Sequence, residues 1–100
     1  MNQFQLVAQV VEREIIRYSP AGIPIVSAKL AHGSEQLEAR VLRSVEFEIS
    51  AVAVGEISGK LNQLELGKLV QFTGFLARKN RNSKSLVFHI TEITENQAIN

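Results

Sequence analysis

A chain of 100 residues has room for one small domain, which excludes two separate domains. Its apolar share of 45% and charged share of 21% are typical of a folded globular chain and exclude a disordered one. The absence of cysteine excludes a disulfide framework, a thiolate zinc site and a cysteine nucleophile. The formal net charge of +1 neither supports nor excludes a nucleic-acid partner.

The N-terminal residues, MNQFQLVAQVVERE, lack the basic segment and long apolar run of a secretory signal peptide. No apolar run in the sequence approaches the roughly 18 residues that a membrane-spanning helix needs. We therefore expect a soluble, cytoplasmic protein.

Charge is distributed unevenly along the chain. Residues 78–84 read RKNRNSK and contain four basic residues and no acidic one. The other 93 residues hold seven Lys or Arg and ten Glu, a net charge of −3, and Asp is absent throughout. Such a local basic segment can attract a polyanion even when the total charge is close to zero.

The N-terminal third of the chain has the pattern of a β-hairpin. Residues 4–11 alternate between two faces with a period of two, and the phase breaks beyond Glu12, which indicates a bend or a β-bulge. Ser19-Pro20-Ala21-Gly22 has the composition of a type I turn. Residues 23–32 resume the alternation, and Pro24 is expected at the start or the edge of this second strand.

The middle of the chain is expected to contain a third strand and a helix. Residues 33–37 are interpreted as a polar connection, and the third strand lies within residues 38–54. Residues 56–66 place Ile57, Leu61 and Leu64 four and then three positions apart, which predicts a short amphipathic helix.

The C-terminal third predicts a second hairpin. Strands are expected over residues 69–78 and 86–93, with the basic segment as the loop between them. Residues 95–100 are expected to form a frayed tail. Five strands, with one short helix between the third and fourth, form the layout of an OB-fold, an all-β, five-stranded Greek-key barrel. We expect residues 1–100 to form one such domain.

The basic loop is the first candidate site. Arg78, Lys79, Arg81 and Lys84 can reach phosphates from a hairpin loop, and each neutralised phosphate releases counterions, so binding would weaken as salt rises. In an OB-fold this loop borders the usual oligonucleotide-binding face. The alternative is a solubilising loop that protects a sheet edge.

Further candidates lie beside the first turn and on the third strand. Arg17 and Tyr18 could combine phosphate attraction with base stacking, or Tyr18 could cap the barrel while Arg17 is solvated. Arg40 and Arg43 are three positions apart on the expected third strand and so lie on opposite faces, which means that at most one of them lines a given face unless a bulge intervenes. Arg43 is included as a candidate for nucleic-acid contact. Phe47 is a candidate for base stacking.

Other aromatic and titratable residues have simpler interpretations. Phe72 could also stack on a base, although a Phe in an alternating strand is more often in the core. His32 and His89 lie on separate strands and are expected to fill half-buried polar positions. No Gly-rich phosphate loop and no nucleophile motif is present, so we expect no enzyme, no metal and no cofactor.

Three segments together resemble a known family. RYSPAGIP (17–24), LAHGS (30–34) and GFLARKNRNSKSLVFHI (74–90) are similar in order and spacing to primosomal replication protein N, the PriB family, which is related to the bacterial single-stranded DNA-binding proteins (SSB). The resemblance implies an SSB-like OB-fold homodimer that binds single-stranded DNA. It also implies contact with the primosomal helicase PriA and, in some bacteria, with DnaT.

The resemblance implies DNA contacts at Arg17, Lys79, Arg81 and Lys84. The chain also departs from the enteric members of the family. Those members carry a Trp near the position of Glu46 and a basic residue at the position of Gly33, and their basic loop is longer. Weaker binding, or a footprint shifted toward the basic loop, follows as a hypothesis.

Dimerisation also has support from the residues themselves. Residues 3–10 carry no charge that would discourage edge-to-edge pairing of the first strand. The leading hypothesis is therefore a dimeric single-stranded DNA-binding accessory of replication restart. A primosomal protein–protein adaptor with weak DNA binding and a small OB-fold RNA-binding protein are the alternatives.

Overall fold

Strands make up most of the computed structural model, which describes residues 1–95. The elements, in chain order, are β1 (Phe4–Arg13), β2 (Arg17–Tyr18), β3 (Pro24–Glu38), β4 (Val41–Val54), α1 (Ile57–Gln63), β5 (Val70–Arg78) and β6 (Leu86–Thr94). Apart from Glu95, the expected frayed tail over residues 95–100 lies outside the described residues. No described helix is long and apolar enough to cross a bilayer.

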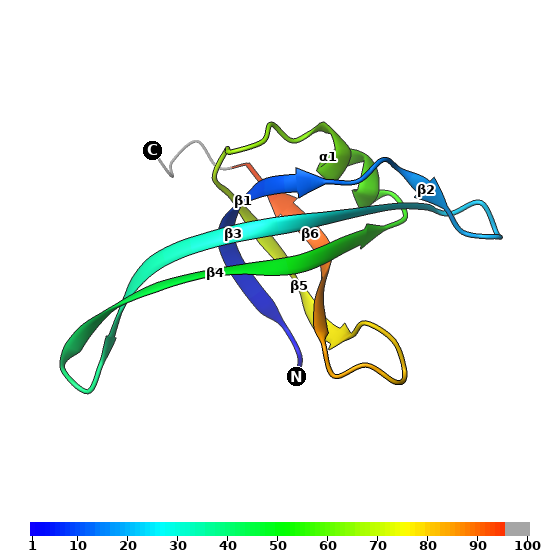
Figure 1. Cartoon of the computed structure of the whole chain (residues 1–100). Coiled ribbons are helices and arrows are strands. Elements are labelled where there is room, and N and C mark those ends of the chain that lie inside the picture. Colours follow the sequence, from blue (N-terminus) through cyan, green and yellow to red (C-terminus); the bar gives the residue numbers. More distant parts are fainter. Residues whose placement is uncertain (96–100) are drawn as a thin grey trace.

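The five long strands form a closed barrel (Figure 1). The sheet runs β1-β5-β6-β4-β3, and a further pairing of β1 with β3 closes it. Only β4 and β6 pair in parallel among these neighbours. The OB-fold prediction is confirmed, with α1 between β4 and β5 and with the two-residue β2 added beside the start of β3.

β1 divides its pairing between two neighbours. Phe4–Ala8 pair with β5, and Gln9–Arg13 pair with β3. The register with β3 shifts between Val10 and Glu12, which confirms the expected irregularity in this strand. The bend lets one strand close both sides of the barrel.

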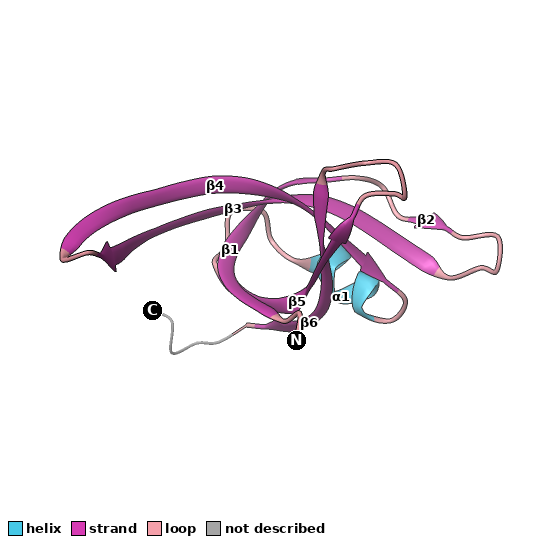
Figure 2. Ribbon diagram, turned by 90° about the horizontal axis from the view of Figure 1, so that it is seen from below, coloured by secondary structure: helices cyan, strands magenta, loops and turns pink. Residues whose placement is uncertain are grey.

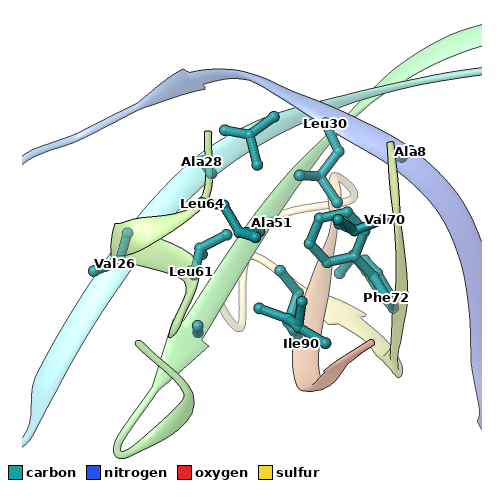
Figure 3. Packing of buried hydrophobic residues seen from close by; sticks show 14 residues of the cluster. Ala8, Val26, Ala28, Leu30, Ala51, Leu61, Leu64, Val70, Phe72 and Ile90 are labelled. Carbon is teal, nitrogen blue, oxygen red and sulfur yellow. The ribbon is translucent and has the colours of Figure 1, made fainter. Parts of the chain in front are cut away.

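The barrel core consists of the alternate side chains of each strand that point inward. Leu30, Phe72 and Phe88 are fully buried. Figure 3 shows Leu30 and Phe72 among smaller residues of β1, β3 and β4. Phe72 is therefore a core residue and is unavailable for base stacking. Leu61 and Leu64 from α1 and its C-cap cover one end of this core.

Arg13 anchors the helix to the barrel. Its Nη1 donates hydrogen bonds to the carbonyl oxygens of Leu61, at 3.1 Å, and Leu64, at 2.6 Å. Both carbonyls lie at the C-terminal end of α1, where helical carbonyls lack partners within the helix and favour a cation.

β3 and β4 continue past the barrel as a long hairpin, and we call residues 33–46 the arm (Figures 1 and 2). The interpretation of residues 33–37 as a connection is therefore wrong. Leu37 and Leu42, at 70% and 66% exposure, form a cross-strand pair near its tip. Because the arm is solvated on both faces, its sequence is not held to the apolar–polar alternation that marks a half-buried strand.

A two-residue turn joins the strands of the arm. Ala39 and Arg40 have φ angles of 52° and 67°, and Glu38 pairs with Val41 across the turn. Two consecutive positive φ angles are typical of a type I′ hairpin turn. Arg40 therefore lies in a turn, and the expectation that it shares a strand with Arg43 is wrong.

Candidate nucleic-acid interface

A groove of about 820 Å³ crosses the outer face of β3, β4 and β6. The side chains of this face alternate with those that fill the core, so Ser27 and Lys29 of β3 project to the opposite side from Ala28 and Leu30. The same alternation separates His89 of β6 from Phe88 and Ile90. The groove is thus built on the closed barrel, which holds its strands in fixed register.

Strand register places the groove residues in rows that cross the sheet. Ser27 pairs with Val52, Val52 with His89, and His89 with Phe75, so these four side chains form one row across β3, β4, β6 and β5. Lys29 and Ser50 lie in the neighbouring row. Valines and small side chains therefore form the floor between β3 and β6.

Four basic residues line the groove, one each from β1, β2, β3 and the loop between β5 and β6. Arg13 of β1 is already hydrogen-bonded to the carbonyls at the end of α1. Arg17 reaches it from β2 and donates a hydrogen bond from Nη1 to Ser27 Oγ at 2.8 Å. Lys29 projects from β3, and Lys79 projects from the loop between β5 and β6. Glu12 and Glu14 line the end near β1, and Glu14 Oε1 lies 3.9 Å from Arg17 Nη1. The end near Lys79 is therefore the more positive one.

The structure brings together two of the predicted contact residues that are far apart in sequence. Arg17 and Lys79 both line the groove. Arg78 ends β5, and Arg81 and Lys84 are exposed in the same loop without lining the groove. The loop is held by hydrogen bonds from the Lys79 amide to the Ser85 carbonyl and from the Ser83 amide to the Asn80 carbonyl. Its cations are thus presented from a shaped turn beside the groove.

Tyr18 lies next to the groove without lining it. It is in β2 opposite Pro24 and is 64% exposed. This exposure contradicts the alternative in which Tyr18 caps the barrel. The ring remains accessible to a ligand that passes Arg17.

Arg43 and Phe47 lie away from the groove, on β4. Arg43 is on the arm and forms an ion pair with Glu38. Phe47 lies at the base of the arm, 41% exposed, with its ring centroid 5.0 Å from that of His32. The two ring nitrogens of His32 are hydrogen-bonded to the Val7 carbonyl and to Ser34 Oγ. A ligand that contacted both the groove and these residues would have to extend from the barrel onto the arm.

Sequence reasoning missed Lys29, His89 and Phe75 as residues of the outer face. A signal was present for Lys29 and His89, because each lies between two core residues of its strand. Phe75 lies between Gly74 and the partly buried Leu76. The position of a residue in the strand alternation shows whether its side chain lies on the outer face. Which outward side chains of β4 and β6 are neighbours depends on the parallel pairing of these two strands.

The sequence matches one protein family and several curated relatives. Residues 2–92 match the family described as "Another single-strand binding protein family". The chain is 40% identical to the replication restart protein PriB of Nitrosomonas europaea over 91 residues, which are 91% of this chain and 84% of that protein. It is 36% identical to the replication restart protein PriB of Neisseria meningitidis serogroup B, with 94% of each chain covered.

Two solved structures have folds similar to that of this chain. The PriB protein of Ralstonia solanacearum superposes with a TM-score of 0.87 at 42% identity, covering 96% of this chain and 99% of that one. A small single-stranded DNA-binding protein from Streptomyces coelicolor superposes with a TM-score of 0.72 at 18% identity, covering 99% and 97% of the two chains. The second likeness concerns the fold alone.

Proposed function

Because this chain belongs to the replication restart protein PriB family, we propose that it is a single-stranded DNA-binding accessory protein of replication restart. The observation that carries the proposal is the groove on the outer face of the barrel, with Arg17, Lys29 and Lys79 around a floor of valine and serine side chains. Cations suit the phosphates of a nucleic acid, and a floor of small side chains with an aromatic ring beside it leaves room for unpaired bases.

The strand would enter along the basic loop. Arg78, Lys79, Arg81 and Lys84 give this loop its positive charge, and Lys79 joins it to the groove. Arg17 and Tyr18 then offer a cation and an exposed ring at the β2 end. Arg43 and Phe47 would be reached only by a longer strand that continues onto the arm.

The proposal includes the protein partners of the primosome. We propose that the chain binds and stimulates the PriA helicase and that DnaT is a further partner. The arm supports a protein-facing role, because Leu37 and Leu42 are exposed at its tip and Glu35 and Glu46 are exposed along it. Apolar side chains bordered by charge are typical of protein–protein contact surfaces.

A salt series on labelled oligonucleotides tests the DNA-binding proposal. Fluorescence anisotropy should show tighter binding to oligo-dT than to a duplex of equal length, because only the single strand offers bases to the groove. The logarithm of the affinity should fall linearly with the logarithm of the salt concentration. Equal binding to strand and duplex, or no dependence on salt, would contradict the proposal.

The same titration with the helicase added separates the alternative function. A primosomal adaptor would not change the anisotropy of the oligonucleotide when it is added alone. It would still bind PriA. The exposed apolar tip of the arm is the observation that favours this alternative. Preference for oligo-U over oligo-dT would instead indicate an RNA-binding protein.

We also propose that the protein is a homodimer joined through β1. β3 pairs with β1 only from Gln9 onward, so within residues 1–95 the second edge of Phe4–Ala8 has no strand neighbour. The exposed Phe4 and Val7 lie on this uncharged segment. Two copies could pair there antiparallel about a two-fold axis.

Light scattering after gel filtration tests the dimer. The wild-type protein should have twice the 11.1 kDa mass of the chain. Gln3→Lys combined with Gln5→Lys should give the monomer mass, because pairing would bring like charges together. Asn62→Lys with Gln63→Lys adds the same charge at exposed positions of the helical segment and should remain dimeric. A monomeric wild-type protein would refute this assembly.

A further inference from the structure

Phe75 and His89 form a stacked pair on the outside of the barrel. They face each other across β5 and β6, with ring centroids 4.9 Å apart and ring planes inclined by only 8°. His89 lines the groove, whereas Phe75 does not and is 38% exposed. A molecule in the groove would therefore meet the imidazole of His89 first, with the phenyl ring of Phe75 behind it.

The pair stands at one end of the row that crosses the groove. From β3 the row runs through Ser27 and Val52 to His89, and Arg17 is hydrogen-bonded to its first residue. Neighbouring strands are about 4.8 Å apart, so β3 and β6 are separated by about 10 Å. A cation and a flat aromatic surface thus border the same floor of small side chains at a spacing on the scale of a nucleotide.

We infer that the ring of His89, supported from behind by Phe75, is a platform on which a base of single-stranded DNA stacks. Arg17 and Lys29 hold the phosphates on the opposite side of the groove. This inference deepens the proposed function and rests on it. The cations surrounding the floor suit a polyanion, and stacking on an aromatic surface tolerates any base.

The alternative is that the Phe75–His89 pair only covers the outer face of the sheet and does not contact a base. Abasic DNA distinguishes the two roles, because it keeps the phosphates and lacks the bases. We would measure the anisotropy of labelled oligo-dT and of an abasic strand of equal length with Phe75→Leu and His89→Ala. Each substitution should weaken oligo-dT binding about tenfold, in the range expected for loss of one stacked base, and leave abasic binding unchanged. Leu66→Ala, which truncates an exposed apolar side chain outside the groove, should leave both affinities unchanged.

A fluorescent variant gives a second readout that a structural role would not change. The chain has no Trp, so His89→Trp introduces a single indole at the platform. Its emission should be quenched by oligo-dT and not by the abasic strand, while far-ultraviolet circular dichroism confirms that the barrel is retained.

The outcomes distinguish the platform from the function on which it rests. If the wild-type protein binds oligo-dT, and the two variants lose affinity equally for oligo-dT and the abasic strand or lose none, the platform is refuted while the function stands. Unquenched emission of bound His89→Trp refutes it as well. Absence of wild-type binding to oligo-dT overturns both.

Discussion

Replacing Lys79, Arg81 and Lys84 together by alanine should weaken oligo-dT binding and flatten its dependence on salt. Each lost phosphate contact on a single strand lowers the slope of log affinity against log salt by about 0.7, so loss of all three lowers it by about 2. Because the three cations share one short loop, the triple variant removes most of the positive charge at the entrance to the groove.

Single substitutions and a charge-matched control make this prediction specific. Lys79→Ala alone should have the largest effect, because Lys79 lines the groove and the other two do not. The triple substitution of Arg40, Lys60 and Lys68 by alanine removes the same charge outside the groove and should leave the slope nearly unchanged. An unchanged slope in the loop variant would exclude the loop as a phosphate-binding element.

Gly74→Ala should destabilise the barrel strongly, by about 3 kcal/mol or more. A Cβ atom at this position would lie 1.9 Å from the carbonyl oxygen of His89 and 3.1 Å from the Cα of Ile90. Those are backbone atoms of the paired strand and cannot move aside alone. β5 and β6 would have to separate where their register shifts, between Thr73 and Gly74.

Thermal unfolding checks this prediction. In a domain of this size each kcal/mol lowers the Tm by about 4–8 °C. Gly59→Ala is the matched control, because a Cβ there meets no atom within 4 Å and alanine favours the helix. That variant should be as stable as the wild type or more so. A similar Tm for both variants would show that the close approach of β5 and β6 at Gly74 is not required.

The same close approach brings the aromatic pair together. Gly74 is followed by Phe75, whose ring stacks on the side chain of His89. If β5 moved away from β6, the phenyl ring would no longer support the imidazole. A Gly74 variant that still folds should therefore also bind oligo-dT more weakly.

The barrel could be predicted from sequence because burial imposes a period of two on its strands. Val26, Ala28 and Leu30 show this period, and each is buried. The arm could not be predicted, because neither of its faces is covered. Residues 33–37 therefore read as a connection although they continue β3.

The candidate site was predicted only in part, for a related reason. The basic loop is visible as a run of charge, and Arg17 was found beside a turn. The meeting of Arg17 with Lys79, and of Val52 with His89, depends on pairings between distant strands. No local pattern specifies the register of β4 against β6, so Lys29 and His89 could be placed on an outer face but not in one groove.

The division of β1 between two partners has a consequence for the order of folding. The β3–β4 hairpin closes around a two-residue turn, whereas the β1–β5 pairing joins Phe4 to Gly74. The entropy lost in closing a loop grows with its length, and distant pairings slow folding. We therefore expect the long hairpin to form early and the N-terminal half of β1 to join last, so that the proposed dimer edge is completed only when the barrel closes.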